Sequence, residues 1–268
     1  MNKTIGFIGS GNMGGAMIGG IIKAGLTAKE NIYVSDINEE SLARVRESYG
    51  VNTTTDNAQL AKVCDIIVLS VKPFLYPVVI NQIKTVVKED VIIVVIAAGQ
   101  SSEAVAQLFG REIKIVKTMP NTPALVGEGM AAIAPAKNVK KEEIAEITAI
   151  FNSFGKSEIV PEHLMDAVTA VSGSSPAYVY MMIEAMADAA VVEGMPRPQA
   201  YKFAAQAVLG SAQMVLETGK HPGELKDMVC SPGGTTIAAV AKLEETGFRS
   251  SIMQSMKACA DKSREMSK

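Results

Sequence analysis

Three glycines near the start of the chain have the spacing of a phosphate-binding turn. Gly9, Gly11 and Gly14 form a G-x-G-x-x-G pattern that follows an apolar run and precedes a helical pattern. Gly9 would permit a tight turn out of a strand, Gly11 would let a pyrophosphate approach bare backbone, and Gly14 would let the helix pack closely. The N-terminus of that helix would add free N–H groups and the positive end of a dipole. The pattern therefore predicts a dinucleotide site.

Asp36 lies where such a site needs an acidic residue. A strand pattern over residues 31–35 ends at Asp36, roughly 20 residues past Gly14, where a carboxylate would meet a ribose hydroxyl. A 2′-phosphate at the same place would be repelled, and no arginine follows until Arg44. A glycine-rich turn in some other βαβ unit is the alternative, and the strand, the helix and the acidic residue together favour a nucleotide site.

A second stretch of glycines and hydroxyls precedes a helical pattern at residues 231–236 (Ser-Pro-Gly-Gly-Thr-Thr). Backbone N–H groups, hydroxyls and the helix dipole in this arrangement suit a carboxylate ligand. A helix cap with a glycine turn is the alternative, and this stretch alone slightly favours the cap. Residues 172–176 have the same two interpretations, and within them we predict Ser174 as a further substrate-binding residue.

The chain offers no obvious strong general base. Of its two histidines, His163 lies near a domain junction and His221 precedes a proline. No lysine occurs between Lys156 and Lys202. Oxidation of an alcohol needs a strong base, normally His or Lys. Reduction of a C=N bond needs less, because a cyclic imine is itself basic and the iminium accepts hydride once substrate and cofactor are oriented. The residue types therefore favour imine reduction, with a hydroxyl such as that of Thr236 as donor to the ring nitrogen.

Strand and helix patterns alternate over the first half of the chain. β-branched and apolar runs cover residues 4–8, 31–35, 66–70, 91–97 and 114–118, and a sixth covers 130–134. Helical patterns cover 14–24, 39–49, 57–62 and 77–84. Continuous apolar runs of this kind are typical of buried parallel strands. They predict an α/β fold with an N-terminal doubly wound (Rossmann) sheet in residues 1–160.

Three loops follow the carboxyl ends of these strands, at residues 70–73, 97–99 and 119–123, where doubly wound sheets bind ligands. Lys72 could approach a cofactor or be a solvated loop lysine. Asn57, after a Thr-rich turn, could be the N-cap of a helix or an adenosine contact. Position alone leaves the alternatives for Lys72 open, whereas for Asn57 a cap is the commoner use.

Residues 161–268 carry only helical patterns, at 176–193, 198–217, 237–245 and 250–263. The first of these, with Ser175 as a predicted N-cap, is apolar nearly all round and should be buried on every side. Its length and its charges argue against a membrane span. Because a domain of roughly 100 residues has little room to bury such a helix, we expect another subunit to cover part of it.

Composition excludes several classes of protein. A net charge of -2 without a basic run implies no nucleic-acid partner. Cys64, Cys230 and Cys259 lie far apart, so no metal site is predicted and a reducing compartment is indicated. The chain begins almost directly with a strand pattern, which predicts no signal peptide and a cytoplasmic protein. The hydrophobic fraction of 48% is ample for a core, and no apolar run is typical of a membrane span.

Over essentially its full length the chain closely resembles the pyrroline-5-carboxylate reductase family. The stretch at 225–236 (Leu-Lys-Asp-Met-Val-Cys-Ser-Pro-Gly-Gly-Thr-Thr) looks like the family signature. Further agreement lies at 6–13 (Gly-Phe-Ile-Gly-Ser-Gly-Asn-Met), 71–73 (Val-Lys-Pro), 97–99 (Ala-Ala-Gly), 119–123 (Met-Pro-Asn-Thr-Pro) and 172–178 (Ser-Gly-Ser-Ser-Pro-Ala-Tyr).

The resemblance implies reduction of 1-pyrroline-5-carboxylate to L-proline with NADPH or NADH. It implies that Ser231, Gly234, Thr235 and Thr236 hold the substrate, with Thr236 as the proton donor. The implied cofactor contacts are Gly9, Ser10, Gly11, Asn12, Met13, Gly14, Ser35, Asp36, Asn57, Val71, Lys72 and Ala97. It also implies a homodimer formed through the helical domain, often assembled into a decamer. Members usually prefer NADPH, whereas Asp36 favours NADH.

Alternative functions come from two other classes. A β-hydroxyacid dehydrogenase shares a dinucleotide domain followed by helices, but its interdomain helix carries a catalytic lysine that residues 176–193 lack. A regulator that binds NAD(P)H without turnover would keep the fold, because fold alone does not fix function. A regulator would bind the reduced nicotinamide without consuming it.

Overall fold

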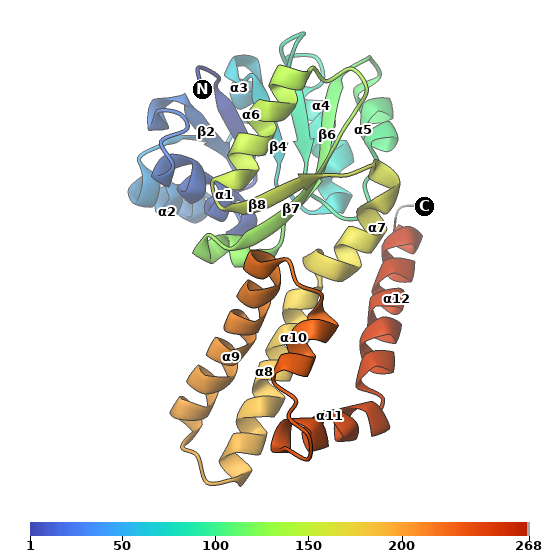
Figure 1. Cartoon of the computed structure of the whole chain (residues 1–268). Helices are drawn as coiled ribbons and strands as arrows, with labels where there is room; N and C mark the ends of the chain where they lie inside the picture. Colours follow the sequence, from blue (N-terminus) through green and yellow to red (C-terminus); the bar gives the residue numbers. More distant parts are fainter. Residues whose placement is uncertain (267–268) are drawn as a thin grey trace. The chain divides into compact units, whose positions relative to one another are not determined.

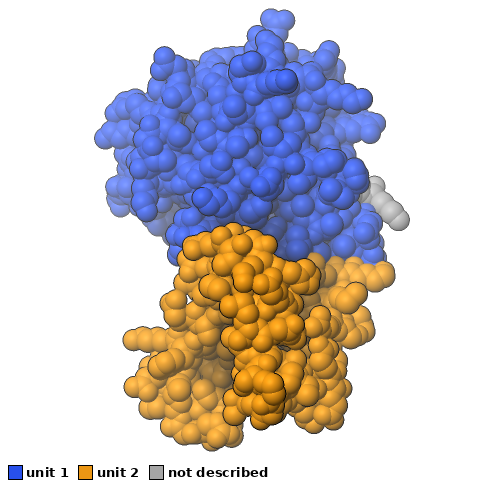
Figure 2. All heavy atoms as spheres, in the orientation of Figure 1, with its two compact units in different colours: residues 1–174, 259–268 blue, residues 175–258 orange. Residues whose placement is uncertain are grey.

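The protein, described over residues 1–266 by a computed structural model, divides into two compact units. Of the described residues, the first comprises 1–174 together with 259–266, and the second is Ser175–Ala258 (Figure 2). The first unit is an α/β sheet and the second is helical (Figure 1), so the predicted fold class is confirmed.

Within the described residues the first unit holds an eight-stranded sheet of order β3-β2-β1-β4-β5-β6-β7-β8. All neighbours are parallel except β6 and β7. The strands are β1 (Ile5–Ile8), β2 (Ile32–Ser35), β3 (Asn52–Thr54), β4 (Ile66–Leu69), β5 (Ile92–Val95), β6 (Lys114–Met119), β7 (Gly129–Pro135) and β8 (Gly155–Ile159). Ile8 pairs with Ser35 of β2 and Leu69 of β4, so the carboxyl ends of these three strands are level. The strand order reverses between β1 and β4, which is where such sheets bind ligands.

Helices cover both faces of the sheet, as a doubly wound sheet requires. One apolar cluster joins one face to α1 (Asn12–Lys23), α2 (Glu39–Tyr49) and α6 (Lys141–Asn152). A second joins the other face to α3 (Asn57–Val63), α4 (Tyr76–Ile83) and α5 (Ser102–Phe109). Because β1, β4 and β5 are buried at every position, they read as the continuous apolar runs seen in the sequence.

The six predicted strands and four predicted helices of this unit match the structure within two residues at each end. The interpretation of the Thr-rich stretch before Asn57 as a turn is wrong in part, because residues of this stretch form β3. This three-residue strand and β8 lie at the two edges of the sheet, where one side stays open to water. Because their sequences are polar, as at Lys156 and Glu158 in β8, a search for apolar runs does not find these strands.

The second unit consists of helices, and no strand follows β8 within the described residues. They are α8 (Ser175–Val192), α9 (Arg197–Thr218), α10 (Pro222–Met228), α11 (Thr235–Glu245) and the start of α12 (Phe248–Met266). Helix α8 already begins at Ser175, so the prediction of Ser175 as its N-cap is wrong; the π-helix Thr169–Gly173 precedes it. None of the helices within residues 1–266 is long and apolar enough to cross a membrane.

Helix α8 packs along α9 (Figure 1), yet most of its apolar surface stays uncovered. Ala187 is its one buried residue along a length that the structure describes completely. Tyr180, Met181 and Val192 are 60%, 69% and 84% exposed. An apolar surface of this extent on a monomer marks an interface.

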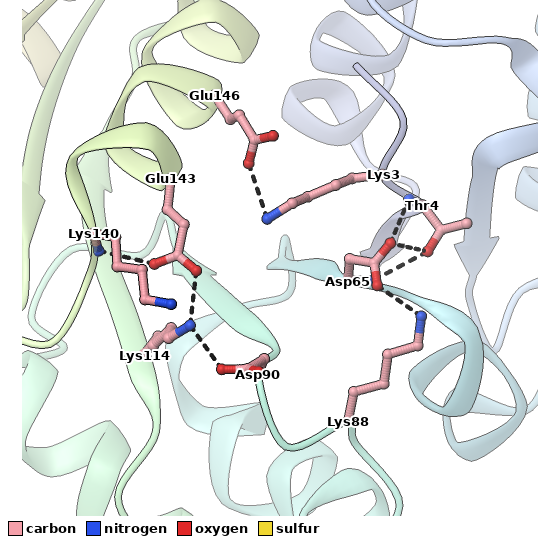
Figure 3. A network of polar contacts seen from close by, with 9 residues as sticks. All are labelled: Lys3, Thr4, Asp65, Lys88, Asp90, Lys114, Lys140, Glu143 and Glu146. Atoms are coloured by element: carbon pink, nitrogen blue, oxygen red, sulfur yellow. Dashed lines mark hydrogen bonds and ion pairs between the residues drawn. The ribbon is translucent and has the colours of Figure 1, made fainter.

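Ion pairs tie the strands together at their amino ends, opposite the ligand-binding edge (Figure 3). Lys114, at the start of β6, contacts Asp90 at 2.9 Å and the buried Glu143 of α6 at 2.7 Å. Asp65, directly before β4, accepts hydrogen bonds from the main chain of Thr4 and from Lys88. These contacts fix α6 and the strand ends of the first unit relative to one another.

We expect Glu143→Gln to lower the free energy of unfolding by about 2 kcal/mol at neutral pH, as for a lost hydrogen bond to a charged group. Burial raises the pKa of Glu143, but the hydrogen bonds from Lys114 and the main chain of Lys140 outweigh it, and the pKa lies below its usual 4.5. A carboxyl group with a lowered pKa stabilises the fold above its unfolded pKa, and this contribution is lost as the pH falls through the folded value. The variant and the wild type should therefore converge in acid.

Urea unfolding as a function of pH measures this difference. Glu142→Gln is the matched control, because Glu142 is the exposed neighbour in the first turn of the same helix. Equal losses in the two variants would remove the special role of Glu143.

Candidate functional site

The glycine loop has the geometry that its spacing predicts. Gly9 adopts a φ of +104°, and a Cβ there would lie 2.6 Å from the carbonyl oxygen of Ser70. A Cβ on Gly14 would lie 2.8 Å from the carbonyl oxygen of Gly9, whereas a Cβ on Gly11 would meet no atom beyond the adjacent backbone within 4 Å. Helix α1 begins directly afterwards, at Asn12. The turn and the helix need their glycines for close packing, and the space at Gly11 leaves room for a ligand.

Asp36 is tied to this loop. The main-chain N–H and the hydroxyl of Ser10 both donate to Asp36 Oδ2, at 2.7 and 2.6 Å, and the N–H of Asn38 donates to Oδ1 at 3.0 Å. Burial raises the pKa of Asp36, but these hydrogen bonds together outweigh it and hold the pKa below its usual range. Asp36 is therefore a fixed negative charge at the carboxyl end of β2, and it braces the turn between β1 and α1.

Ser35 and Asn57 also meet. The fully buried hydroxyl of Ser35 donates to Asn57 Oδ1 at 2.7 Å, and Asn57 Nδ2 donates to Gln82 Oε1 at 2.7 Å. The interpretation of Asn57 as an N-cap is wrong, because Asp56 caps α3 by accepting from the N–H groups of Ala58 and Gln59. Sequence reasoning missed Gln82, whose part in orienting Asn57 depends on a contact 25 residues away.

The loops after β4 and β5 lie along the same edge of the sheet. Ser70 donates to the carbonyl oxygen of Gly9 at 2.6 Å, so the loop that carries Val71 and Lys72 is attached to the glycine turn. Lys72 is exposed at the start of a 3₁₀ helix, whereas Ala97 is buried.

A groove of about 850 Å³ opens beside the glycine loop within the first unit. It shares Ser10, Gly11 and Asn12 with that loop and continues along α1 to Arg44 of α2. Arg44 donates to Ser41 at 2.9 Å. The sequence did not predict this groove, because its walls come from segments that only the fold brings together.

The second glycine-and-hydroxyl stretch forms a tight turn in the helical unit. Gly233 adopts a φ of +68°, and the N–H of Gly234 donates to the carbonyl oxygen of Ser231 at 3.0 Å. Helix α11 begins at Thr235, where Ser231 and Thr235 are exposed and Thr236 is half-buried. The first turn of α11 thus combines free N–H groups with hydroxyls, an arrangement that suits a carboxylate.

Comparison with known proteins separates the candidate functions. A family model described as pyrroline-5-carboxylate reductase dimerisation matches residues 162–266, and one described as NADP oxidoreductase, coenzyme F420-dependent, matches residues 4–99. Pyrroline-5-carboxylate reductase of Escherichia coli strain K12 is 50% identical over 268 residues, which is all of both chains. The chain belongs to the pyrroline-5-carboxylate reductase family.

Other members of this family agree over the same length. The pyrroline-5-carboxylate reductase of Methanosarcina acetivorans is 44% identical over all of this chain and 99% of its own. Two solved pyrroline carboxylate reductases, from Coxiella burnetii and from Plasmodium falciparum with NADP bound, superimpose with TM-scores of 0.94 and 0.90. They are 32% and 36% identical, and each alignment covers all of this chain and at least 99% of the other.

Proposed function

We propose that the chain catalyses the reduction of 1-pyrroline-5-carboxylate to L-proline with NADPH or NADH, the last step of proline biosynthesis. The observation that carries this proposal is full-length identity of 44–50% to proteins that bear the reductase name. The absence of a lysine from α8 disfavours a β-hydroxyacid dehydrogenase. Intact Gly9–Gly14 and Ser231–Thr236 loops disfavour a non-catalytic regulator.

The cofactor site in this proposal lies at the level carboxyl ends of β1, β2 and β4. The space around Gly11 and the N-terminus of α1 fit a pyrophosphate, and Asp36 fits a ribose hydroxyl. NADH or NADPH bound there supplies the hydride. The contacts are assigned to Gly9, Ser10, Gly11, Asn12, Met13, Gly14, Ser35, Asp36, Asn57, Val71, Lys72 and Ala97.

We assign substrate contacts to the turn before α11 in the second unit and, separately, to Ser174 in the first unit. Ser231 and Thr235 hold the carboxylate with their hydroxyls and with the first N–H groups of α11, which have no partner within the helix. Gly234, whose N–H closes the turn onto Ser231, lets the carboxylate approach the backbone there. The hydroxyl of Thr236 donates to the ring nitrogen while the imine carbon accepts the hydride. One hydride and one proton convert the C=N bond to the amine.

We further propose that residues 1–160 bind the cofactor and that residues 161–268 bind substrate and form a homodimer through the exposed face of α8. Assembly of dimers into a decamer, a cytoplasmic location and the lack of nucleic-acid or membrane partners complete the proposal. The dimer would be contradicted if sedimentation equilibrium at micromolar concentration gave the mass of a monomer.

The first test follows absorbance of the reduced nicotinamide with NADH and NADPH in parallel. Loss that depends on 1-pyrroline-5-carboxylate, with L-proline as product, is the expected result. A folded protein that binds the cofactor but consumes neither form would point to the regulator.

A further inference from the structure

A π-helix leads directly into Ser174. The wide turn spans Thr169–Gly173, and the N–H of Ser174 donates to the carbonyl oxygen of Thr169 at 2.8 Å, five residues back. Such turns are rare and recur at functional sites, because they displace the hydrogen-bonding pattern of the helix. The position of Ser174 therefore depends on what holds this turn open.

Asn121, in the loop after β6, forms a hydrogen bond that holds the π-helical turn in place. Its side-chain Nδ2 donates to the carbonyl oxygen of Ser172 at 3.0 Å, and its Oδ1 accepts from the N–H of Met130, at the start of β7, at 2.8 Å. The residue is 9% exposed, and both bonds are partly buried. A buried amide satisfied at both ends fixes two main-chain groups relative to each other.

Packing also connects the π-helical turn to the end of β6. A Cβ on Gly173 would lie 2.8 Å from Met119 Cε, so the turn rests directly against the end of β6. Beyond the turn, the hydroxyl of Ser174 accepts a hydrogen bond from Cys259 Sγ at 3.2 Å. The turn thus touches the loop that carries Asn121 at two points and leads to a hydroxyl at its end.

We propose that Asn121 is a positioning residue for the substrate, which acts through the carbonyl oxygen of Ser172 to set the Ser174 hydroxyl. The inference rests on the proposed reductase activity and on Ser174 as a substrate contact. Asn121 itself touches neither cofactor nor substrate in this proposal. Its loss moves Ser174 and weakens substrate binding, while the glycine loop and Asp36 keep their contacts.

Asn121→Asp separates the two bonds of the side chain. The carboxylate still accepts from the N–H of Met130, but it has no donor for the carbonyl oxygen of Ser172. At about pH 8 it is ionised. We expect the KM for 1-pyrroline-5-carboxylate to rise about tenfold, with the Kd for NADH unchanged. Asn138→Asp is the matched control, because Asn138 also donates to a main-chain carbonyl, that of Ile113, away from Ser174.

A merely structural role predicts a different result. If Asn121 served only to anchor β7, Asn121→Asp would keep the wild-type KM, and this outcome overturns the proposal. In a Ser174→Ala background Asn121→Asp should add little to the KM, because contacts that act in series are not additive. Full additivity would also overturn it.

Gly173→Ala tests the same turn without a polar change. The added methyl group meets the flexible end of Met119, so the chain should still fold, and the KM should rise as in Asn121→Asp. An unchanged KM in both variants contradicts the positioning role of Asn121 and leaves the proposed reductase function in place. If the wild type itself consumes no NADH or NADPH with this substrate, the proposed function fails instead.

Discussion

Replacement of Thr236 by alanine is expected to lower kcat about 100-fold, the lower end of the range for a positioned proton donor. The hydroxyl stands in the first turn of α11, half-buried, directly after the turn at Gly233 and Gly234. In the proposed mechanism it supplies the proton that the ring nitrogen needs as the carbon accepts the hydride. Binding of the cofactor should be unaffected, because the proposed cofactor contacts all belong to the first unit, whereas Thr236 belongs to the second.

The loss should depend on pH. A cyclic imine takes its own proton from water in acid, so the variant should approach the wild-type rate as the pH falls and lag further behind as it rises. Stopped-flow measurement of nicotinamide oxidation at saturating substrate, over a range of pH, gives this profile.

Two further variants separate the hydroxyl from the shape of the side chain. Thr236→Val keeps the volume and removes the hydroxyl, and it should behave like the alanine variant. Thr236→Ser keeps the hydroxyl and should recover most of the rate. An unchanged kcat in the valine variant would remove Thr236 from its role as acid.

The sequence predicted the centre of the sheet because its strands are uniformly buried. Ile5–Ile8 and Ile66–Leu69 are β-branched or apolar at nearly every position, which is the condition for a strand covered on both faces. The edge strands were not predicted, because their sequences are polar. Asn52–Thr54 is polar, and it is a strand because three residues of β2 pair with it. Such pairing is a tertiary effect that local pattern does not contain.

The same division applies to the candidate site. The turn at Gly9 could be predicted because a positive φ and a close neighbour restrict one position to glycine. The bond from Asn121 to Ser172 joins residues 51 apart, so no local pattern contains it. Asn57 was open between two roles until the fold supplied Asp56 as the cap and Ser35 as its partner.

The charge on Asp36 leads to the second large expected effect, which concerns the choice of cofactor. We expect the wild type to use NADH at least as well as NADPH. Asp36 is held by Ser10 and Asn38, and its lowered pKa keeps it ionised throughout the neutral range. Two unit charges about 4 Å apart repel by roughly 1 to 4 kcal/mol, depending on how much water screens them. A 2′-phosphate beside this carboxylate would bear that cost, whereas the hydroxyl of NADH would gain a hydrogen bond.

Asp36→Asn removes the charge and keeps an oxygen that can accept from Ser10, so the glycine loop should stay in place. We expect the ratio of kcat/KM for NADPH to that for NADH to rise by about 10- to 100-fold. Asp56→Asn is the matched control, because Asp56 caps α3 and is exposed, and its charge has no assigned part in the cofactor site. The ratio should not change in that variant.

The wild-type ratio decides whether Asp36 sets the preference. If kcat/KM favours NADPH by tenfold or more, the repulsion must be offset by a cation. Arg44 is the candidate, because it is the first basic residue after Asp36 and lines the groove beside the glycine loop. Arg44→Ala would then reduce use of NADPH alone. If instead NADH is preferred and Asp36→Asn reverses the order, a single carboxylate at the end of β2 accounts for the choice of cofactor.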